Sequence, residues 1–222
     1  MKTALIAGAT GLVGGLLLRQ LLDAPEYGRV VAVGRRAPEL THPKLVPVVT
    51  DFTALDPLAA DLRGDDAFCC LGTTISDAGS REAFRAVDHA AVLAFAWLAR
   101  RTGADRFFVV SALGADPGAR VFYSRVKGET EQALAVLGFA TLAVFRPGLL
   151  LGPRARPRLG ERCAAAALWL LDPLLLGRLR KYRAIQAQVV ARAMMRCSFG
   201  RPGQGLLVYE SDEIQDLGGF GP

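Results

Sequence analysis

The feature that most constrains the fold is an apolar strand that runs directly into a glycine-rich turn. Residues 3–14 read TALIAGATGLVG. The spacing G-x-x-G-x-x-G suits a tight turn between a strand and a helix, at which the backbone can approach a pyrophosphate closely. The helix that follows would present free N–H groups and its positive dipole end to the phosphates. The residues expected to bind a dinucleotide here are Gly8, which makes the turn, Thr10, Gly11, which allows the close approach, Leu12, Val13, and Gly14, which lets helix and strand pack.

Short apolar segments alternate with helical segments along most of the chain. The apolar segments show little alternation of apolar and polar residues, as is typical of parallel strands buried on both faces. The expected strands are Ala4–Ala7, Val30–Val33, Leu45–Val49, Ala67–Leu71, Arg106–Val110 and Thr141–Phe145. The expected helices are Leu12–Leu22, Arg81–Arg101 and Phe122–Leu137, with a short helix at most in Leu55–Leu62. This order predicts the α/β class: a Rossmann-like, doubly wound parallel sheet in a single domain over residues 1–222.

The sequence changes character after Gly152, where it becomes rich in proline and arginine. Helices are expected around Ala164–Leu171 and Gln186–Cys197, and a late strand over Leu206–Tyr209. We interpret residues 152–222 as a small cap on the substrate side of the sheet, together with its last strand.

Composition restricts the classes of function. The net charge is +6, and only four of the 27 basic residues are lysine. Most arginines are scattered rather than gathered on one face, which favours a solvated basic surface over nucleic-acid binding; an anionic ligand near the C-terminal half is the sharper alternative. The longest apolar run is interrupted by Asp172 and Pro173, so no membrane span is expected. The sequence contains no C-x-x-C pair, so no metal site is indicated. It also lacks a signal-peptide cleavage pattern, which favours a cytoplasmic protein.

The end of the second expected strand indicates which nicotinamide cofactor is preferred. It reads VAVGRR, with Arg35 and Arg36 where an NAD-preferring site usually has an acidic residue. A guanidinium group can bind a 2′-phosphate with two hydrogen bonds, so we expect NADP(H), with NAD(H) as the alternative. Asp51 and Phe52, after the third strand, are placed to meet the adenine. The loop after the fourth strand is placed to line the middle of the cofactor, through Leu71, Gly72, Thr73 and Thr74.

A tyrosine and a lysine four residues apart indicate the reacting group. Tyr123 and Lys127 share one face of an expected helix, and Ser111 follows the fifth strand. A lysine ammonium would stabilise a tyrosine phenolate, so the tyrosine could exchange a proton with a substrate oxygen while the cofactor exchanges a hydride. Ser111 would hold the same oxygen, and Lys127 would also bind the nicotinamide ribose.

Several segments together carry a resemblance to a known family. They are FCCLGTT at 68–74, FRAVD at 84–88, YSRVKGE at 123–129 and FRPG at 145–148. The chain resembles the short-chain dehydrogenase/reductase superfamily over essentially its whole length, and in particular its atypical branch of Tat-interacting-protein-like oxidoreductases. The resemblance implies a Rossmann-like fold, NADPH binding, Ser111, Tyr123 and Lys127 in the catalytic positions, and Pro147 beside the nicotinamide. Most of the superfamily has an asparagine that relays protons at the position of Asp88. The atypical branch that this chain resembles also has an aspartate there.

Two functions remain open from the sequence. The first is an NADPH-dependent oxidoreductase that reduces a small carbonyl compound. The second is an NADPH-binding regulatory or scaffold protein with a protein partner and little turnover, because this fold hosts many functions. Either protein would be a monomer or a homodimer.

Overall fold

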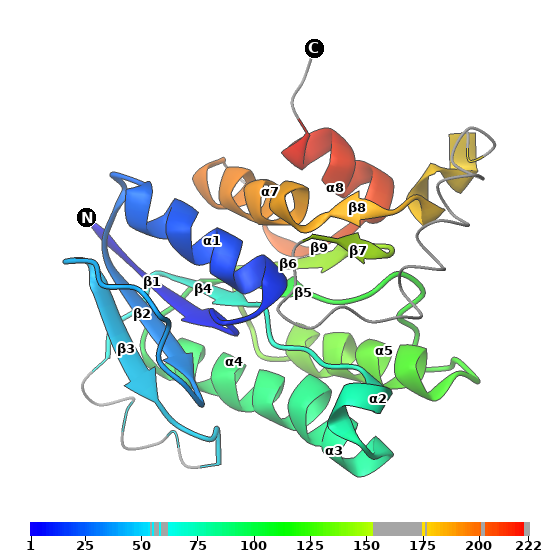
Figure 1. Ribbon diagram of the computed structural model, residues 1–222, viewed down its shortest axis with the longest axis horizontal. Coiled ribbons are helices and arrows are strands. Elements are labelled where there is room, and N and C mark those ends of the chain that lie inside the picture. The colour runs from blue at the N-terminus through cyan, green and yellow to red at the C-terminus, as the bar shows by residue number, and fades with distance from the viewer. Residues whose placement is uncertain are drawn as a thin grey trace.

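The central element of the fold is a parallel β-sheet. The computed structural model describes residues 1–53, 55, 58, 62–152, 175, 177–200 and 203–219. Within them seven strands pair in the order β3-β2-β1-β4-β5-β6-β9, with every neighbouring pair parallel (Figure 1). The strands are β1 (Lys2–Ala7), β2 (Tyr27–Gly34), β3 (Leu45–Val49), β4 (Asp66–Cys69), β5 (Arg106–Val110), β6 (Thr141–Arg146) and β9 (Gly205–Glu210). The direction of winding reverses between β1 and β4, which is where such sheets bind ligands, at the carboxyl ends of the strands.

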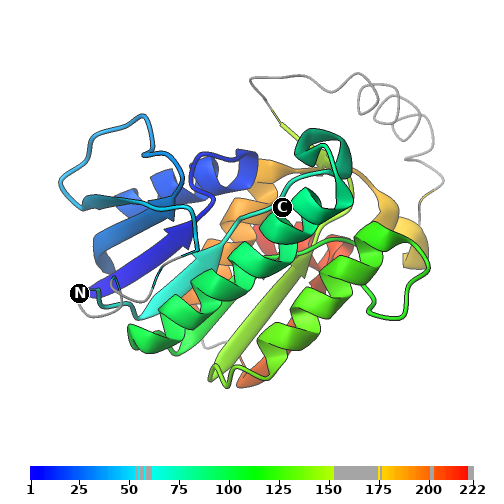
Figure 2. The same cartoon turned by 90° about the horizontal axis from the view of Figure 1, so that it is seen from below.

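Helices cover both faces of the sheet. One layer consists of α1 (Leu12–Asp23), α7 (Ala187–Phe199) and α8 (Ser211–Gly218). The other consists of α4 (Val92–Arg101) and α5 (Phe122–Ala135), which Figure 2 shows side by side, preceded by the short helices α2 (Ile75–Ala78) and α3 (Arg81–Arg85). The two layers explain why the apolar strand segments lack alternation.

Strand β1 illustrates this burial on both faces. Ala4 and Ile6 belong to the cluster that contains the buried side chains of α1 and α7, whereas Leu5 and Ala7 belong to the cluster on the α4 side. All four residues are fully buried. Apolar residues are therefore needed at consecutive positions of a strand, which is the pattern of a parallel sheet between two helical layers. The predicted fold class is confirmed.

One expected helix is divided in the structure. Arg81–Arg101 forms α3, a π-helical segment η2 (Ala86–Ala91) and α4. In the widened turn, the Asp88 carboxylate accepts a hydrogen bond from the Thr73 backbone N–H at 2.8 Å, and its carbonyl accepts one from the Thr130 hydroxyl at 3.0 Å. Apolar periodicity alone does not reveal such a turn, because these bonds come from segments distant in sequence. π-Helical turns are frequent at functional sites.

The C-terminal part contributes to the main layers as well as to the carboxyl edge. The expected last strand is β9, which pairs with β6, and the expected helix Gln186–Cys197 is α7, which packs beside α1 (Figure 1). A small two-stranded sheet of β7 (Leu150–Leu151) and β8 (Ile185–Gln186) and a 3₁₀ helix η4 (Gly177–Tyr182) complete the described elements. The helix expected around 164–171, and most of the segment 55–62, lie outside the described residues. The cap therefore stays a prediction.

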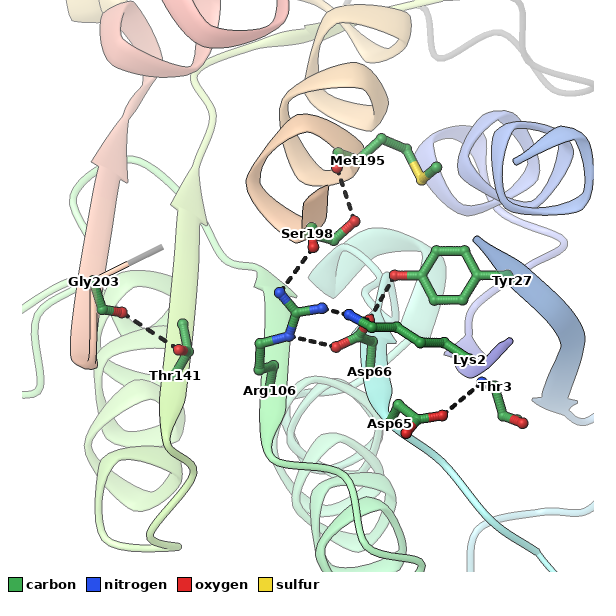
Figure 3. A network of polar contacts seen from close by, with 10 residues as sticks. All are labelled: Lys2, Thr3, Tyr27, Asp65, Asp66, Arg106, Thr141, Met195, Ser198 and Gly203. Carbon is green, nitrogen blue, oxygen red and sulfur yellow. Dashed lines mark hydrogen bonds and ion pairs between the residues drawn. The ribbon is translucent and has the colours of Figure 1, made fainter. Parts of the chain in front are cut away.

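A buried ionic network fastens the amino edge of the sheet, opposite the carboxyl ends of the strands (Figure 3). Asp66 on β4 is fully buried and accepts two hydrogen bonds from Arg106 at 2.6 Å and one from the Tyr27 hydroxyl at 2.7 Å. Arg106 also donates to the carbonyl of Ser198 on α7 at 2.8 Å. The network thereby links β2, β4 and β5 to α7. Burial, and then the Asp66 charge, raise the pKa of Tyr27.

Candidate active site

The glycine-rich turn connects β1 to α1, and its glycines are required for different reasons. Gly8 has φ of +81°, and a Cβ atom there would lie 2.5 Å from the backbone of Cys70. A Cβ atom at Gly14 would lie 2.1 Å from the carbonyl oxygen of Gly8. Gly11 has an ordinary conformation, and a Cβ atom there would lie 3.2 Å from that same oxygen. Gly8 and Gly14 are thus needed for the turn and for helix packing, while Gly11 keeps the mouth of the turn open.

The N-terminus of α1 has the features of an anion site. Its N-cap residue, Gly11, provides no side-chain hydrogen bond, and the first turn contains no acidic residue. The backbone N–H groups of that turn therefore remain available to a ligand, and the helix dipole favours a negative charge there.

A cleft of about 950 Å³ runs along the carboxyl edge of the sheet from this turn to the start of α5. It brings together most of the residues that the sequence analysis selected. They are Thr10, Gly11, Leu12, Val13, Arg36, Leu71, Gly72, Thr73, Thr74, Ser111, Tyr123 and Lys127. A smaller hollow, of about 80 Å³, is lined by Gly8, Arg35 and Phe52 and shares Thr10, Arg36 and Leu71 with the cleft.

Three selected residues line neither space. Gly14 lies under the turn, as described above. Asp51 is exposed, and its carboxylate accepts hydrogen bonds from the backbone and hydroxyl of Thr53 at 3.0 and 2.7 Å, which lower the pKa of Asp51. Pro147 is buried, and its carbonyl accepts a hydrogen bond from the backbone of Leu113 at 3.0 Å. The described structure therefore does not bring Asp51 or Pro147 to the cleft, and their expected contacts with the adenine and the nicotinamide stay predictions.

Three exposed arginines surround the turn. Arg36 lines the cleft and the smaller hollow, Arg35 lines the hollow, and Arg19 reaches the cleft from α1. Within the described part of the chain, none of the three forms a hydrogen bond or an ion pair. Arg19 was not predicted from the sequence. Helical spacing could have identified it, because Leu12, Gly15, Leu16 and Arg19 lie on one face of α1 and all line the cleft.

Lys127 forms a buried ion pair with Asp88. Its ammonium lies 2.7 Å from one carboxylate oxygen, while the other oxygen accepts the hydrogen bond from Thr73. Burial favours the neutral amine, but the neighbouring Asp88 and, next, Tyr123 outweigh it and raise the pKa of Lys127. The lysine is therefore held as a cation whose charge is largely balanced by Asp88. From the sequence, Asp88 was connected only with a proton path, and its ion pair with Lys127 was not predicted.

Ser111 follows β5 and is held from behind by an acidic residue. Its hydroxyl donates a hydrogen bond to the carboxylate of Glu131 on α5. Arg146, at the end of β6, donates from Nε to both oxygens of that carboxylate, at 3.1 and 3.2 Å, and lies 3.3 Å from Glu210. Hydrogen bonds with Glu131 outweigh burial and raise the pKa of Arg146. Glu131 was not selected from the sequence, although it continues the spacing of Tyr123 and Lys127 by another four residues.

Tyr123 completes the set on the first turn of α5. Its ring is half-buried and packs on Phe84 of α3, with ring centroids 5.4 Å apart. Tyr123, Lys127 and Ser111 all line the cleft, at the end remote from Arg36. The cleft therefore has an anion-binding turn and, further along, a phenol, an ammonium and a hydroxyl. Such groups suit proton exchange with an oxygen atom of a small ligand.

Comparison with known proteins decides the family. A family described as NAD(P)H-binding matches residues 8–138, more than half of the chain. Protein HTATIP2 of Rattus norvegicus is 36% identical over 223 aligned residues, which cover 98% of this chain and 89% of the relative. The chain belongs to the NAD(P)H-binding family. Within this family it is an atypical short-chain dehydrogenase/reductase of the HTATIP2 kind, as its motifs predict.

Fungal relatives and solved structures extend the comparison. Protein FMP52 of Saccharomyces cerevisiae is 35% identical over 159 residues, covering 69% of this chain and 68% of the relative. MoeE5, solved with UDP-glucose and NAD, has a TM-score of 0.67 at 19% identity, covering 96% of this chain and 80% of its own. WbmH of Bordetella bronchiseptica, solved with NAD⁺, has a TM-score of 0.70 at 18% identity, covering 95% and 76%. At these identities the two structures show a common fold.

Two properties bear on the setting of this family member. No helix among the described residues has the length and apolar character needed to cross a membrane. The FMP52 relatives are named mitochondrial, so the cytoplasmic location stays a prediction.

Proposed function

We propose that the protein is an NADPH-dependent oxidoreductase that reduces a small carbonyl compound. The observation that carries this proposal is the continuity of one cleft, which contains both the glycine-rich turn and Ser111, Tyr123 and Lys127. A nicotinamide cofactor, when bound, supplies a hydride to the carbonyl carbon. The Tyr123 hydroxyl would give a proton to the carbonyl oxygen, and Lys127 would stabilise the phenolate that remains.

The residues present fit such a cofactor. Gly11 leaves room where a larger side chain would fill the mouth of the turn, and the first turn of α1 leaves its N–H groups open to a pyrophosphate. Lys127 lines the cleft as a cation, one helical turn after Tyr123 on the same face of α5. The structures of MoeE5 and WbmH, which have this fold and contain NAD, support the same class of ligand.

The preference for NADPH over NADH rests on the arginines around the turn. Arg35 and Arg36 follow β2 without a described partner, and Arg19 faces the same cleft. A 2′-phosphate would give these guanidinium groups an ionic partner that the ribose of NADH lacks. We include Arg19 in the proposed phosphate site for this reason.

The experiment that tests the function is a screen for NADPH oxidation with aldehydes, ketones and quinones. Tyr123→Phe should lower turnover by roughly 10²–10⁴-fold on any substrate found, the usual effect of a positioned acid or base. Its affinity for NADPH, measured by calorimetry, should stay near that of the wild type, because the hydroxyl acts on the substrate. Near-normal turnover by this variant would exclude Tyr123 as the proton donor. Binding of NADPH with turnover of no compound in the screen would instead favour the regulatory alternative.

A further inference from the structure

Gly128 is a buried glycine in the middle of α5, one residue after Lys127. A Cβ atom there would lie 2.2 Å from the carbonyl carbon of Asp116 and 2.2 Å from the nitrogen of Pro117, so a larger residue would require the backbone to move. Apart from proline, glycine is the least favourable residue in the interior of a helix, because it loses the most conformational freedom on folding. The close approach of residues 112–121 to α5 explains why glycine stands here.

Residues 112–121 form the loop between β5 and α5, and hydrogen bonds fasten this loop to the helix. The backbone N–H of Asp116 donates to the carbonyl of Ser124 at 3.1 Å. The guanidinium group of Arg125 donates to the carbonyl of Ala119 at 2.9 Å. The loop is therefore docked on the first turns of α5 by hydrogen bonds as well as by the contact at the glycine.

The docked loop supports the turn of α5 that carries Tyr123. The N-cap residue of α5 is Val121, whose side chain forms no capping hydrogen bond. A helix start without a side-chain cap depends on its packing and on neighbouring backbone for order. Further along, α5 is fixed independently, because Lys127 pairs with Asp88 at 2.7 Å. A side chain at position 128 would therefore displace the loop and, with it, the turn of Tyr123.

We propose that Gly128 is a positioning residue for Tyr123. By admitting the loop against α5, Gly128 sets where the Tyr123 hydroxyl lies relative to Ser111, so that both groups reach the same substrate oxygen. In the proposed function of the cleft, on which this inference rests, Tyr123 donates the proton to that oxygen. Gly128 is not among the described residues that line the cleft, and it acts through the loop.

The substitution Gly128→Ala tests this role with the smallest possible side chain. Gly118→Ala is the matched control, because Gly118 lies in the same loop and a Cβ atom there would lie at an ordinary 3.4 Å from Asp116 Oδ1. Arg125→Met is a second variant, which removes the hydrogen bond to Ala119 and places no new atom between the loop and the helix. It should release the loop even if Gly128→Ala fails to fold.

The first measurement needs no substrate. Hydrogen exchange followed by mass spectrometry should be about tenfold or more faster in residues 112–121 of Gly128→Ala and Arg125→Met, and unchanged in β5. When 3-fluorotyrosine replaces the four tyrosines, the ¹⁹F NMR signal that disappears in Tyr123→Phe identifies Tyr123. That signal should shift in both variants and stay in place in Gly118→Ala. An unshifted Tyr123 signal in folded Gly128→Ala, or in Arg125→Met if the first variant does not fold, would overturn the proposal.

The second measurement uses a substrate from the carbonyl screen. Gly128→Ala should lower kcat about tenfold or more, the cost of a misplaced catalytic group, while the Kd of NADPH stays within about twofold of the wild type. In a Tyr123→Phe background the same substitution should have little further effect, because Gly128 acts through Tyr123. Losses that multiply in the double variant would contradict the proposal. If the wild type turned over nothing, the proposed function would fall, and the ¹⁹F signal would still decide whether Gly128 positions Tyr123.

Discussion

Individual arginines differ in what they are free to bind. Arg106 and Arg146 are fixed in ion pairs with Asp66 and Glu131, so each mainly holds neighbouring elements together. Arg35 and Arg36 are exposed and have no partner among the described residues. An arginine with no protein partner at the rim of a binding cleft can use all of its guanidinium donors to bind an anion. Residue type alone does not separate these two groups, whereas their partners do.

Replacing Arg35 and Arg36 by alanine should weaken NADPH binding and leave NADH binding nearly unchanged. Each charge-assisted contact with a 2′-phosphate is worth about 1.5–3 kcal/mol, so the affinity for NADPH should fall about tenfold or more. Calorimetric titration of both cofactors measures it. Arg29→Ala, an exposed site near the amino end of β2, is the control for general loss of charge. Equal affinities of the wild type for both cofactors would remove the basis for an NADPH preference.

Gly11→Val should abolish cofactor binding while the protein stays folded. The new side chain would begin 3.2 Å from the Gly8 carbonyl, which requires a small adjustment, and would extend into the mouth of the turn. Gly14→Val is the contrasting variant, because its Cβ atom would lie 2.1 Å from the same carbonyl and should prevent folding. Circular dichroism and NADPH titration distinguish these outcomes. A folded Gly11→Val protein that bound NADPH normally would restrict the turn to a structural role.

Sequence reasoning found the site residues that carry a local signal. The glycine turn, Ser111, Tyr123 and Lys127 were selected from spacing, and the structure places all but the packing glycine Gly14 at the cleft or its adjoining hollow. Partners from distant segments were not foreseen, since nothing local to Lys127 predicts Asp88 and nothing local to Ser111 predicts Glu131. These pairs depend on how α5 lies against η2 and β5, which is a property of the fold.

At the scale of elements, α5 and η2 together define the chemistry of the cleft. One face of α5 carries Tyr123, Lys127 and Glu131 at four-residue intervals. Tyr123 and Lys127 line the cleft, whereas Glu131 binds Arg146. The π-helical turn of η2 brings Asp88 against Lys127 and the loop after β4. Apolar periodicity predicted one continuous helix over Arg81–Arg101, and the segment is helical. It did not predict the wider π-helical turn of η2, which the hydrogen bonds of Asp88 with Thr73 and Thr130 favour.

Asp88→Asn should alter the pH dependence of turnover. Burial favours the neutral amine, and Asp88 is the largest cause that keeps the pKa of Lys127 raised, so this pKa should fall when the carboxylate is removed. Turnover that depends on the Lys127 cation should then decline at a lower pH than in the wild type. The pH–rate profile with a substrate from the screen measures this shift. Asp105→Asn, at an exposed site, should leave the profile in place, and an unchanged profile for Asp88→Asn would show that the ion pair is only structural.

On the scale of the whole molecule, the two edges of the sheet have separate roles. The carboxyl edge carries the cleft, and the amino edge carries the buried network of Asp66, Arg106 and Tyr27 (Figure 3). Removing one member of a buried ionic network leaves an unbalanced charge or an unsatisfied polar group, which is strongly destabilising. Stability and binding are thus supported by different residues of the same strands.

The network predicts how stability depends on alkaline pH. The pKa of Tyr27 is raised in the folded protein above the ordinary value of about 10, so its neutral form stabilises the fold. This contribution is complete below pH 10 and is lost as the pH rises further, because the unfolded chain then gives up a proton that the folded chain retains. Urea unfolding between pH 8 and 11 measures the effect. Tyr27→Phe should show a smaller loss of stability above pH 10, and an identical loss would assign it to other groups.

Helix α7 has a consequence for how the protein is made. Every residue of the proposed catalytic set has been synthesised once α5 is complete, and β6 follows soon after. The face of β1 that carries Ala4 and Ile6, however, shares its apolar cluster with Val190 and Met194 of α7, which packs beside α1 (Figure 1). A nascent chain that stops short of residue 199 therefore exposes this surface beside the cofactor turn. We therefore expect the nucleotide-binding half to complete its packing only after α7 has left the ribosome, because part of this apolar surface stays uncovered until then.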